Sequence, residues 1–416
     1  MSVSRVDKFI REILGTASLA AARDARGIPV VLQLSQNLTD KHLVMAEVLV
    51  DLALRSTKGP IVIDLERPHP GLADRLRRVA RRFDPSSEAR LAFDRCEADT
   101  SLAVRVGGTS AGNGIFADAA GWTASVNRPL PLDQEAAAPA LAFACAAAFA
   151  KAFAVAVLGR DRRGVGGEAW SFCLRSFSDS ESIEPFVRAQ SIGRITLLGG
   201  GAIGSAFCYV LLLGGWEGEL LILDRDDYAE PNEETTLLVS RRMVLDLVPK
   251  AETLATIVSA QGPLKAHGEK VEIVQGHPYL TAPTDFFVVA VDNPETRRLL
   301  DATGARVVVN GAVGGGASSA GHVLLSRHGV QNKPLSALYP PRSGGGEDDA
   351  RSLPDEVDEC SRVPYQKASL AAPFVGLASG ALLAASCANI IVPANELSYL
   401  KFDLLARQGR FLRRVG

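Results

Sequence analysis

The sequence has almost no excess of either charge, no C-x-x-C cysteine pair and no signal-peptide pattern in residues 1–15. Lys and Arg total 45 against 47 Asp and Glu, so no net field draws the chain onto nucleic acid or an anionic membrane. The N-terminal residues 1–15 lack the apolar core of a signal peptide, and their pattern predicts a short amphipathic helix. The cysteines show neither a disulfide framework nor the paired motif of a structural zinc site. We therefore expect a cytoplasmic protein without nucleic acid or structural zinc. The six cysteines lie at positions 96, 145, 173, 208, 360 and 387.

Strongly apolar runs are also scarce, although two segments are nearly free of charge. They span residues 136–158, interrupted only by Lys151, and residues 368–394. Both are long enough to cross a bilayer. Because Ala, Gly and Ser dominate them, the gain from membrane insertion is small. Two buried helices are the favoured interpretation, with no membrane partner, and membrane spans are the alternative.

The length and the order of segments indicate two similar halves. A chain of 416 residues exceeds one ordinary core. In each half a Gly-rich segment, at 101–126 and again at 306–326, precedes an Ala-rich helix. A degenerate duplication of one α/β unit predicts this order, and chance similarity is the alternative. We expect an α/β domain over residues 1–160, a linker over 161–190 and a second α/β domain over 191–416.

The second half has the pattern of a parallel sheet covered on both faces. Short apolar runs at 194–200, 219–224, 285–292 and 305–311 are separated by helical or polar stretches. A polar segment rich in Gly and Pro follows and predicts a mobile loop over 339–360.

A glycine loop lies between the first of these strands and the helix after it. Gly199, Gly201 and Gly204 satisfy G-x-G-x-x-G, and Asp224 ends the next strand. Glycines there allow backbone N–H groups to approach phosphates, and the acidic residue can accept hydrogen bonds from a ribose. This pattern fits NAD, FAD or ATP equally well. A tight turn that binds no ligand is the structural alternative.

Further polar residues narrow the choice of nucleotide. After the glycine loop come D-x-D, an Asn, a Lys at the head of a helix, and D-N with an Arg beyond. This ordered set resembles the ThiF/MoeB family, which includes the ubiquitin-activating enzymes, and the resemblance covers residues 194 to about 400. The residues are Asp224, Asp226, Asn232, Lys250, Asp292, Asn293 and Arg297.

The resemblance implies a Rossmann-like adenylation domain that uses ATP and Mg²⁺. Asp224 would bind the ribose, Asn232 and Lys250 the phosphates, and Asp292 the metal. Each residue has a structural alternative, as a helix cap, a turn residue or a solvated lysine. An NAD-dependent oxidoreductase would explain the glycine loop but neither Lys250 nor the D-N pair.

One position departs from the family. Where its members carry an arginine that acts on the triphosphate, three residues after the Asn, this sequence has Thr235. Arg241, Arg242 or an arginine from the first half could replace it. Without a replacement the chain would be a non-catalytic scaffold.

Cys360 follows the polar loop and precedes the second Ala-rich helix. Its position resembles that of the thioester-forming cysteine in activating enzymes without a large inserted cysteine domain. A thiolate there can attack an acyl-adenylate because AMP leaves readily. An ordinary cysteine is the alternative, since the neighbouring Glu359 disfavours a thiolate. Adenylation of a sulfur carrier or peptide without a thioester therefore stays open.

The first half contains none of the motifs that mark the second. The resemblance therefore implies an internal pseudo-dimer of an inactive and an active adenylation half, and leaves further oligomerisation open. Its implied partners are a ubiquitin-like protein and a ubiquitin-conjugating-like enzyme. The compact chain looks most similar to bacterial activating enzymes of ubiquitin-like conjugation operons, which implies a role in antiviral defence.

Overall fold

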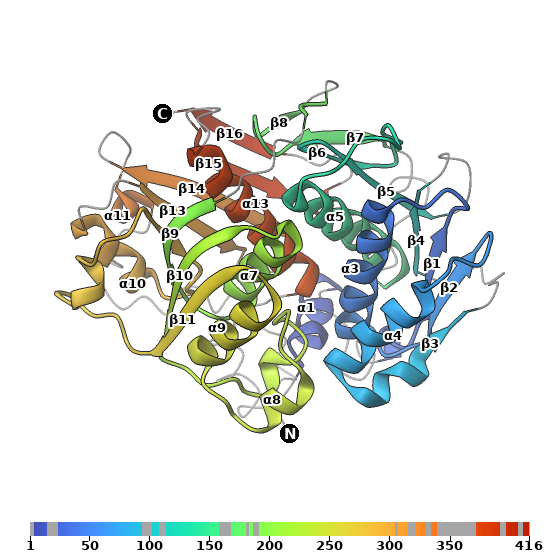
Figure 1. Cartoon of the computed structure of the whole chain (residues 1–416), viewed down its shortest axis with the longest axis horizontal. Coiled ribbons are helices and arrows are strands. Elements are labelled where there is room, and N and C mark those ends of the chain that lie inside the picture. Colours follow the sequence, from blue (N-terminus) through green and yellow to red (C-terminus); the bar gives the residue numbers. More distant parts are fainter. Residues whose placement is uncertain are drawn as a thin grey trace.

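A computed structural model of the chain reveals two sheets of equal size on either side of a layer of helices (Figure 1). The structure describes residues 4–14, 24–93, 102–107, 114–157, 168–179, 183–185, 191–303, 307–314, 321–329, 334–338, 372–391, 397–406 and 411–415.

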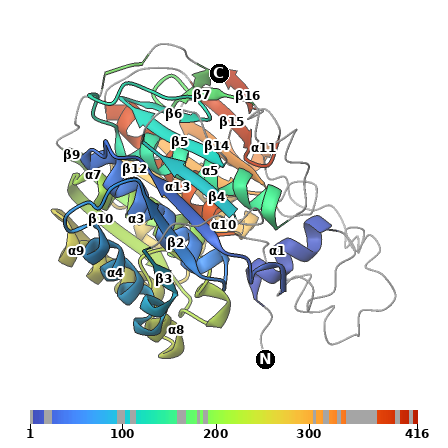
Figure 2. The same cartoon turned by 90° about the vertical axis from the view of Figure 1, so that its right-hand side faces the viewer.

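The first sheet has eight strands in the order β3-β2-β1-β4-β5-β6-β7-β8. Strands β1 to β5 pair in parallel, and β6 to β8 pair antiparallel with their neighbours. Figure 2 looks onto this half of the molecule. The strands are β1 (Val30–Leu34), β2 (Ile61–Leu65), β3 (Leu91–Ala92), β4 (Leu102–Val106), β5 (Ile115–Ala120), β6 (Thr123–Val126), β7 (Trp170–Cys173) and β8 (Ser178–Asp179).

The second sheet repeats this order as β11-β10-β9-β12-β13-β14-β15-β16. Again the first five strands pair in parallel and the last three antiparallel. All four strands expected from the apolar runs are present. The strands are β9 (Ser191–Leu198), β10 (Glu217–Asp224), β11 (Leu264–Lys270), β12 (Phe286–Val289), β13 (Val307–Val313), β14 (His322–Gly329), β15 (Leu397–Asp403) and β16 (Phe411–Val415).

The helices repeat as well. In the two halves α3 and α7 follow the first strand, α4 and α9 the second, and α5 and α13 the sixth. The predicted fold class is therefore confirmed in its architecture: a Rossmann-like α/β half preceded by an α/β half of the same topology. The helices are α1 (Arg5–Leu14), α3 (Asp40–Ser56), α4 (Leu72–Phe83), α5 (Ala138–Ala156), α7 (Ala202–Gly214), α8 (Arg241–Leu245), α9 (Lys250–Gln261), α10 (Pro294–Leu299), α11 (Leu335–Leu338) and α13 (Pro373–Ile391).

The first sheet extends beyond residue 160. Strands β7 and β8 lie within 161–190, the segment expected to be a linker, and they pair with β6 and with each other. Phe172 and Cys173 of β7 are buried in the core, and Trp170 is half-buried against it. Part of the expected linker therefore belongs to the first half.

The two Ala-rich segments form the helices α5 and α13, which pack against each other between the sheets. Among the described helices α5 is the one long and apolar enough to cross a membrane, and 94% of its apolar window is buried inside the protein. One hydrophobic core runs through both halves. For example, Phe143 of α5 lies edge-on to Phe402 of β15, with ring centroids 5.1 Å apart.

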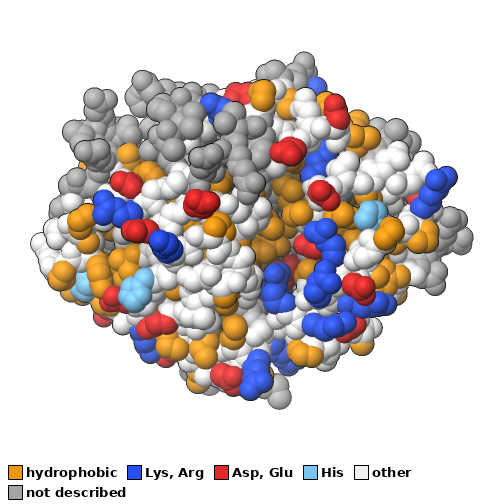
Figure 3. All heavy atoms as spheres, viewed as in Figure 1, with side chains coloured by type: hydrophobic (Ala, Val, Ile, Leu, Met, Phe, Trp, Pro, Cys, Tyr) orange, Lys and Arg blue, Asp and Glu red, His pale blue; other side chains and the backbone are white. Residues whose placement is uncertain are grey.

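Basic side chains gather on the surface around α4 (Figure 3). Most arginines of this helix have acidic partners: Arg75 pairs with Glu47, and Arg77 and Arg81 with Glu88. The basic face of α4 is therefore largely neutralised by its neighbours.

Candidate active site

The glycine loop joins β9 to α7 at the carboxyl ends of the parallel strands. Gly199 has φ +99°, and a Cβ there would lie 2.8 Å from the carbonyl oxygen of Ala290. A Cβ on Gly204 would lie 1.9 Å from the carbonyl oxygen of Gly199. A Cβ on Gly201, the N-cap of α7, would meet nothing within 4 Å. The loop therefore needs glycine for its shape at Gly199 and Gly204, whereas Gly201 borders open space at a helix N-terminus, which suits a phosphate.

Asp224 at the end of β10 holds the glycine loop in place. Its Oδ2 accepts a hydrogen bond from Gly200 N–H at 2.6 Å, and its Oδ1 accepts one from Asp226 N–H at 2.9 Å. Burial raises the pKa of this carboxyl, and the nearby Lys250 opposes the shift. Each carboxylate oxygen has a further lone pair, so the residue can still accept a ribose hydroxyl.

Lys250 is the first residue of α9 and lies beside the glycine loop. A Cβ added to Gly200 would come within 3.3 Å of Lys250 Cβ. The Lys250 ammonium lies 3.0 Å from Asp226 Oδ2, and its side chain is only 11% exposed. The D-x-D motif thus has two tasks: its first carboxylate binds the loop and its second orients the lysine.

Asn232 has a structural task. Its Oδ1 accepts a hydrogen bond from Ala229 N–H at 2.9 Å, and the residue is buried. Next to it Tyr228 donates a hydrogen bond to the carbonyl oxygen of Gly200 at 3.1 Å. These contacts correspond to the turn-forming alternative, and binding of phosphate by Asn232 stays a prediction.

The two residues of the D-N motif after β12 also differ in their surroundings. Asp292 is exposed. Asn293 caps α10 by accepting a hydrogen bond from Glu295 N–H at 2.8 Å. Arg297 is turned inward and donates to Asn310 Oδ1 at 2.6 Å. Within the described residues no group of three or more His, Cys, Asp or Glu side chains is placed to hold a metal ion. A Mg²⁺ ion at Asp292 would therefore take most of its ligands from phosphate oxygens, water or parts of the chain beyond the described residues.

The sequence left Arg241, Arg242 or an arginine of the first half as alternatives for the family arginine that is missing at Thr235, a fully buried residue. Arg241 points into the junction between the halves, where it pairs with Asp84 at 3.1 Å and Glu233 at 3.5 Å. Arg242 has a side chain that is 90% exposed and pairs with Asp246 of its own helical turn. Neither arginine of α8 therefore has a described contact with the loop or with Asp292.

An arginine of the first half does approach the crevice. Burial lowers the pKa of Arg5, on α1, and the carboxylate of Asp292 opposes that shift. Arg5 Nε is buried and has no hydrogen-bond partner among the described residues. The sequence indicated only that α1 is an amphipathic helix, so Arg5 could not be singled out before the halves were seen together.

The cysteines that the structure describes are unreactive by position. Cys145, Cys173, Cys208 and Cys387 are buried, and burial raises the pKa of Cys387 to about 12. Cys360 and the predicted loop over 339–360 lie outside the described residues.

Comparisons with known proteins each cover about half of the chain. Residues 193–392 match the family model described as the BilD C-terminal domain. No curated protein matches the chain. Solved structures that resemble it include Escherichia coli MccB with ATP, at 14% identity and TM-score 0.40, covering 53% of this chain and 63% of that one. Another is PaaA, at 13% identity and TM-score 0.37, covering 54% and 64%. The chain thus spans less than two thirds of these proteins, and the fold assignment rests on the repeated sheet order.

Proposed function

We propose that this chain uses ATP to adenylate the C-terminal carboxylate of a ubiquitin-like protein. One observation supports the proposal: an open helix N-terminus, two carboxylates and a lysine lie where β9, β10 and β12 end, and an arginine of the first half interacts electrostatically with one of these carboxylates. The groups are the open helix N-terminus at Gly201, the carboxylates of Asp224 and Asp292, and the cations of Lys250 and Arg5.

Each group has a task in such a reaction. The loop N–H groups and the N-terminus of α7 would hold phosphates, and Asp224 would accept hydrogen bonds from the ribose. The substrate carboxylate attacks the α-phosphorus, the bond to the β-phosphate breaks, and pyrophosphate leaves with its electron pair. Lys250 and Arg5 would offset the charge that grows on that leaving group. Asp292 would hold Mg²⁺, which supplies further positive charge.

The second step is a thioester on Cys360. Its thiolate would attack the acyl carbon of the adenylate, the bond to AMP would break, and AMP would leave. A cysteine of a ubiquitin-conjugating-like enzyme would then take the acyl group. This step rests on the sequence resemblance at residue 360.

The first half is proposed to be catalytically inactive. Between β1 and α3 the chain has Ser35 to Thr39 and no glycine. Thr39 caps α3, and its own N–H donates to His42 Nδ1 at 3.1 Å.

We place the protein in the cytoplasm, in a bacterial ubiquitin-like conjugation system with a role in antiviral defence. Genes for a ubiquitin-like protein and a conjugating enzyme beside this one support that setting, and an isolated gene contradicts it.

ATP–pyrophosphate exchange tests the adenylation. We expect exchange that depends on the ubiquitin-like protein and falls by about a hundredfold or more in Lys250→Ala, since the lysine neutralises the leaving group. Calorimetry should detect binding of ATP with Mg²⁺ and no binding of NAD. Binding of NAD alone would instead identify an oxidoreductase.

Cys360→Ala tests the thioester. We expect this variant to keep exchange and to lose a thiol-sensitive covalent adduct. An adduct that persists would place the thioester on another cysteine, whereas its absence from the wild-type protein leaves adenylation of a sulfur carrier or peptide as the activity.

A further inference from the structure

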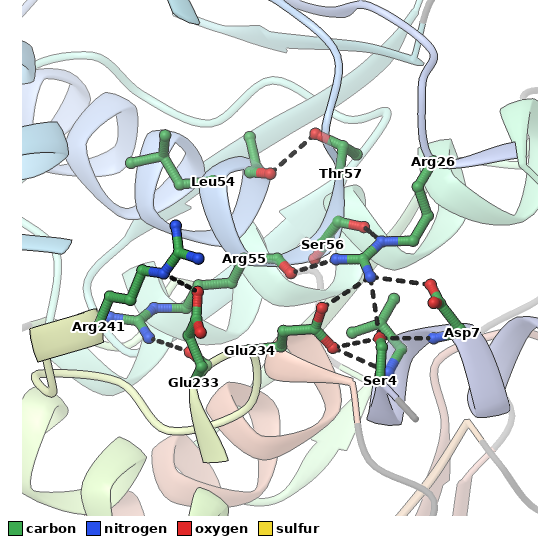
Figure 4. A network of polar contacts seen from close by, with 12 residues as sticks. Ser4, Asp7, Arg26, Leu54, Arg55, Ser56, Thr57, Glu233, Glu234 and Arg241 are labelled. Atoms are coloured by element: carbon green, nitrogen blue, oxygen red, sulfur yellow. Dashed lines mark hydrogen bonds and ion pairs between the residues drawn. The ribbon is translucent and has the colours of Figure 1, made fainter. Parts of the chain in front are cut away.

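A polar cleft of about 560 Å³ lies where α1, the end of α3 and the turn after α4 meet the second half. From the second half the cleft is lined by Glu230, Pro231, Glu233, Glu234 and Arg241. Residues 233–239 follow Asn232 and contain Thr235. We call this segment the junction loop. Figure 4 shows the contacts around it, with Arg26 of the first half pointing toward the carboxylate of Glu234.

Arg55 at the end of α3 binds the backbone of the junction loop directly. Its Nη1 donates to the carbonyl oxygens of Glu233 and Thr236, both at 2.8 Å, and its Nη2 to that of Val239 at 3.1 Å. Its Nε donates to Asp51 Oδ1 at 2.9 Å. The guanidinium is buried. One side chain of the first half therefore fixes three carbonyl groups of the second.

Arg26 adds a second link, which reaches α1. Its Nη1 pairs with Glu234 Oε1 of the junction loop at 2.7 Å and with Asp7 Oδ1 of α1 at 2.9 Å. The other oxygen of Glu234 accepts a hydrogen bond from Val6 N–H at 3.3 Å and one from Ser4 Oγ. The junction loop thus caps the N-terminus of α1, the helix that carries Arg5.

Asp51 connects this arrangement to the helix of the glycine loop. Besides Arg55 it pairs with Arg82 at 3.5 Å. The guanidinium of Arg82 lies 5.9 Å from the ring of Tyr209 on α7. One buried carboxylate of the first half therefore holds two arginines, and each reaches a different element of the second half.

We propose that Arg55 and Arg26 are positioning residues for adenylation: they fix the junction loop, and through Glu234 they fix α1, so that Arg5 stands at the phosphates. This inference rests on the proposed function. The first half, proposed to be inactive itself, would then contribute to adenylation in addition to packing against the second half.

Arginine is required for this task because of its shape. A guanidinium presents five N–H donors in a rigid plane, whereas an ammonium presents three from one point. A lysine at position 55 keeps the charge beside Asp51 but cannot reach the carbonyl groups of Glu233, Thr236 and Val239 together. Arg55→Lys therefore removes the positioning and keeps the charge.

The experiment compares Arg55→Lys with Arg90→Lys. Arg90 is a matched control, because it lines the same cleft and also donates to backbone carbonyls, but only to those of Leu54, Thr57 and Gly59 in the first half. For Arg55→Lys we expect kcat of pyrophosphate exchange to fall about tenfold or more, since small displacements of reacting groups cost this much. The Kd for ATP, from calorimetry, should change less than about threefold, because the glycine loop is untouched.

Hydrogen exchange and a double variant complete the test. Amides of residues 4–10 and 233–239 should exchange faster in Arg55→Lys and not in Arg90→Lys. If Arg55 acts through Arg5, Arg5→Ala combined with Arg55→Lys should be no slower than Arg5→Ala alone. Additive losses, or an equal fall of kcat in Arg90→Lys, overturn the proposal. A wild-type protein without exchange overturns the proposed function itself, whereas normal kcat in Arg55→Lys overturns only the positioning.

Discussion

At the scale of single residues, the crevice draws its cations from both halves. Lys250 is oriented by Asp226 within the second half, whereas Arg5 arrives on α1 of the first. Arg5 is desolvated, and its Nε has no hydrogen-bond partner among the described residues. A buried polar atom left in this way costs about 1–3 kcal/mol. The charge that grows on a leaving pyrophosphate would accept from Arg5 and recover that energy in the transition state.

Removal of this arginine tests that interpretation. For Arg5→Ala we expect kcat of pyrophosphate exchange to fall by about a hundredfold, because the growing charge of the leaving group loses one cation. Arg242→Ala is the control, since that side chain is 90% exposed and should leave the rate unchanged. Equal rates in the two variants would remove Arg5 from the site.

Single residues also show which parts of the site could be predicted from the sequence and which could not. Gly199, Gly204 and Asp224 could be predicted because their task is set by neighbours within one strand-turn-helix unit. Arg297 matched the family order as well, yet it bonds to Asn310 on β13. That contact depends on which strands adjoin, and a linear pattern does not contain it.

At the scale of elements, the strand–loop–helix unit from β9 to α7 separates two uses of glycine. A Cβ at Gly201 would enter open space, whereas one at Gly204 would lie 1.9 Å from a backbone oxygen. The first glycine therefore leaves room for a ligand, and the second allows the helix to start so close to the strand.

Two alanine variants test this division. Gly201→Ala should keep the melting temperature and weaken ATP binding about tenfold or more, because the methyl group takes the place of a phosphate. Gly204→Ala should lower the melting temperature sharply, since the backbone must shift. Thermal unfolding and calorimetry measure both effects. Unchanged ATP affinity in Gly201→Ala would contradict phosphate binding at this loop.

The helices α5 and α13 were predictable from composition, but their surroundings were not. Long Ala-rich runs without charge predict buried helices wherever they lie. What they pack against could not be predicted, because α5 and α13 belong to different halves and meet only when the halves associate. The same holds for α1, whose amphipathic pattern does not say which surface it covers.

One lysine of α5 gives this helix a pH-dependent effect on stability. Lys151 is buried, its ammonium lies 5.6 Å from the ring centre of Trp170, and burial lowers its pKa from 10.5 to about 8. Between these two values the unfolded chain binds more protons than the folded one, so this residue makes stability rise with pH there.

Replacing Lys151 with methionine should therefore remove this residue's contribution to the pH dependence of stability. Relative to wild type, the variant's free energy of unfolding should fall by roughly 1–3 kcal/mol between pH 8 and pH 10.5, the range expected for a shift of this size. Urea unfolding at both pH values measures the difference. Lys58→Met, which changes an exposed lysine, should track wild type. Parallel curves for Lys151→Met and wild type would refute the burial argument.

At the scale of the whole molecule, the two halves share one core, so they should unfold together. Phe402 of β15 packs on Phe143, Trp170 and Phe172 of the first half, with ring centroids 5.1–5.5 Å apart. Phe287 of β12 is equally buried, but its cluster contains only residues of the second half.

Calorimetry of the intact chain should thus give a single transition. Phe402→Ala and Phe287→Ala should each destabilise it by about 3–5 kcal/mol, the usual cost of removing a buried phenyl ring. Because the transition is shared, either variant lowers the stability of both sheets, which hydrogen exchange in β1 and β9 would report. If the halves were independent, Phe287→Ala would move one of two transitions and leave β1 protected. If the first half stayed folded after the second had unfolded, Arg26 and Arg55 would lose their contacts with the junction loop. The contacts that couple the unfolding of the two halves would therefore include those proposed to position Arg5 for adenylation.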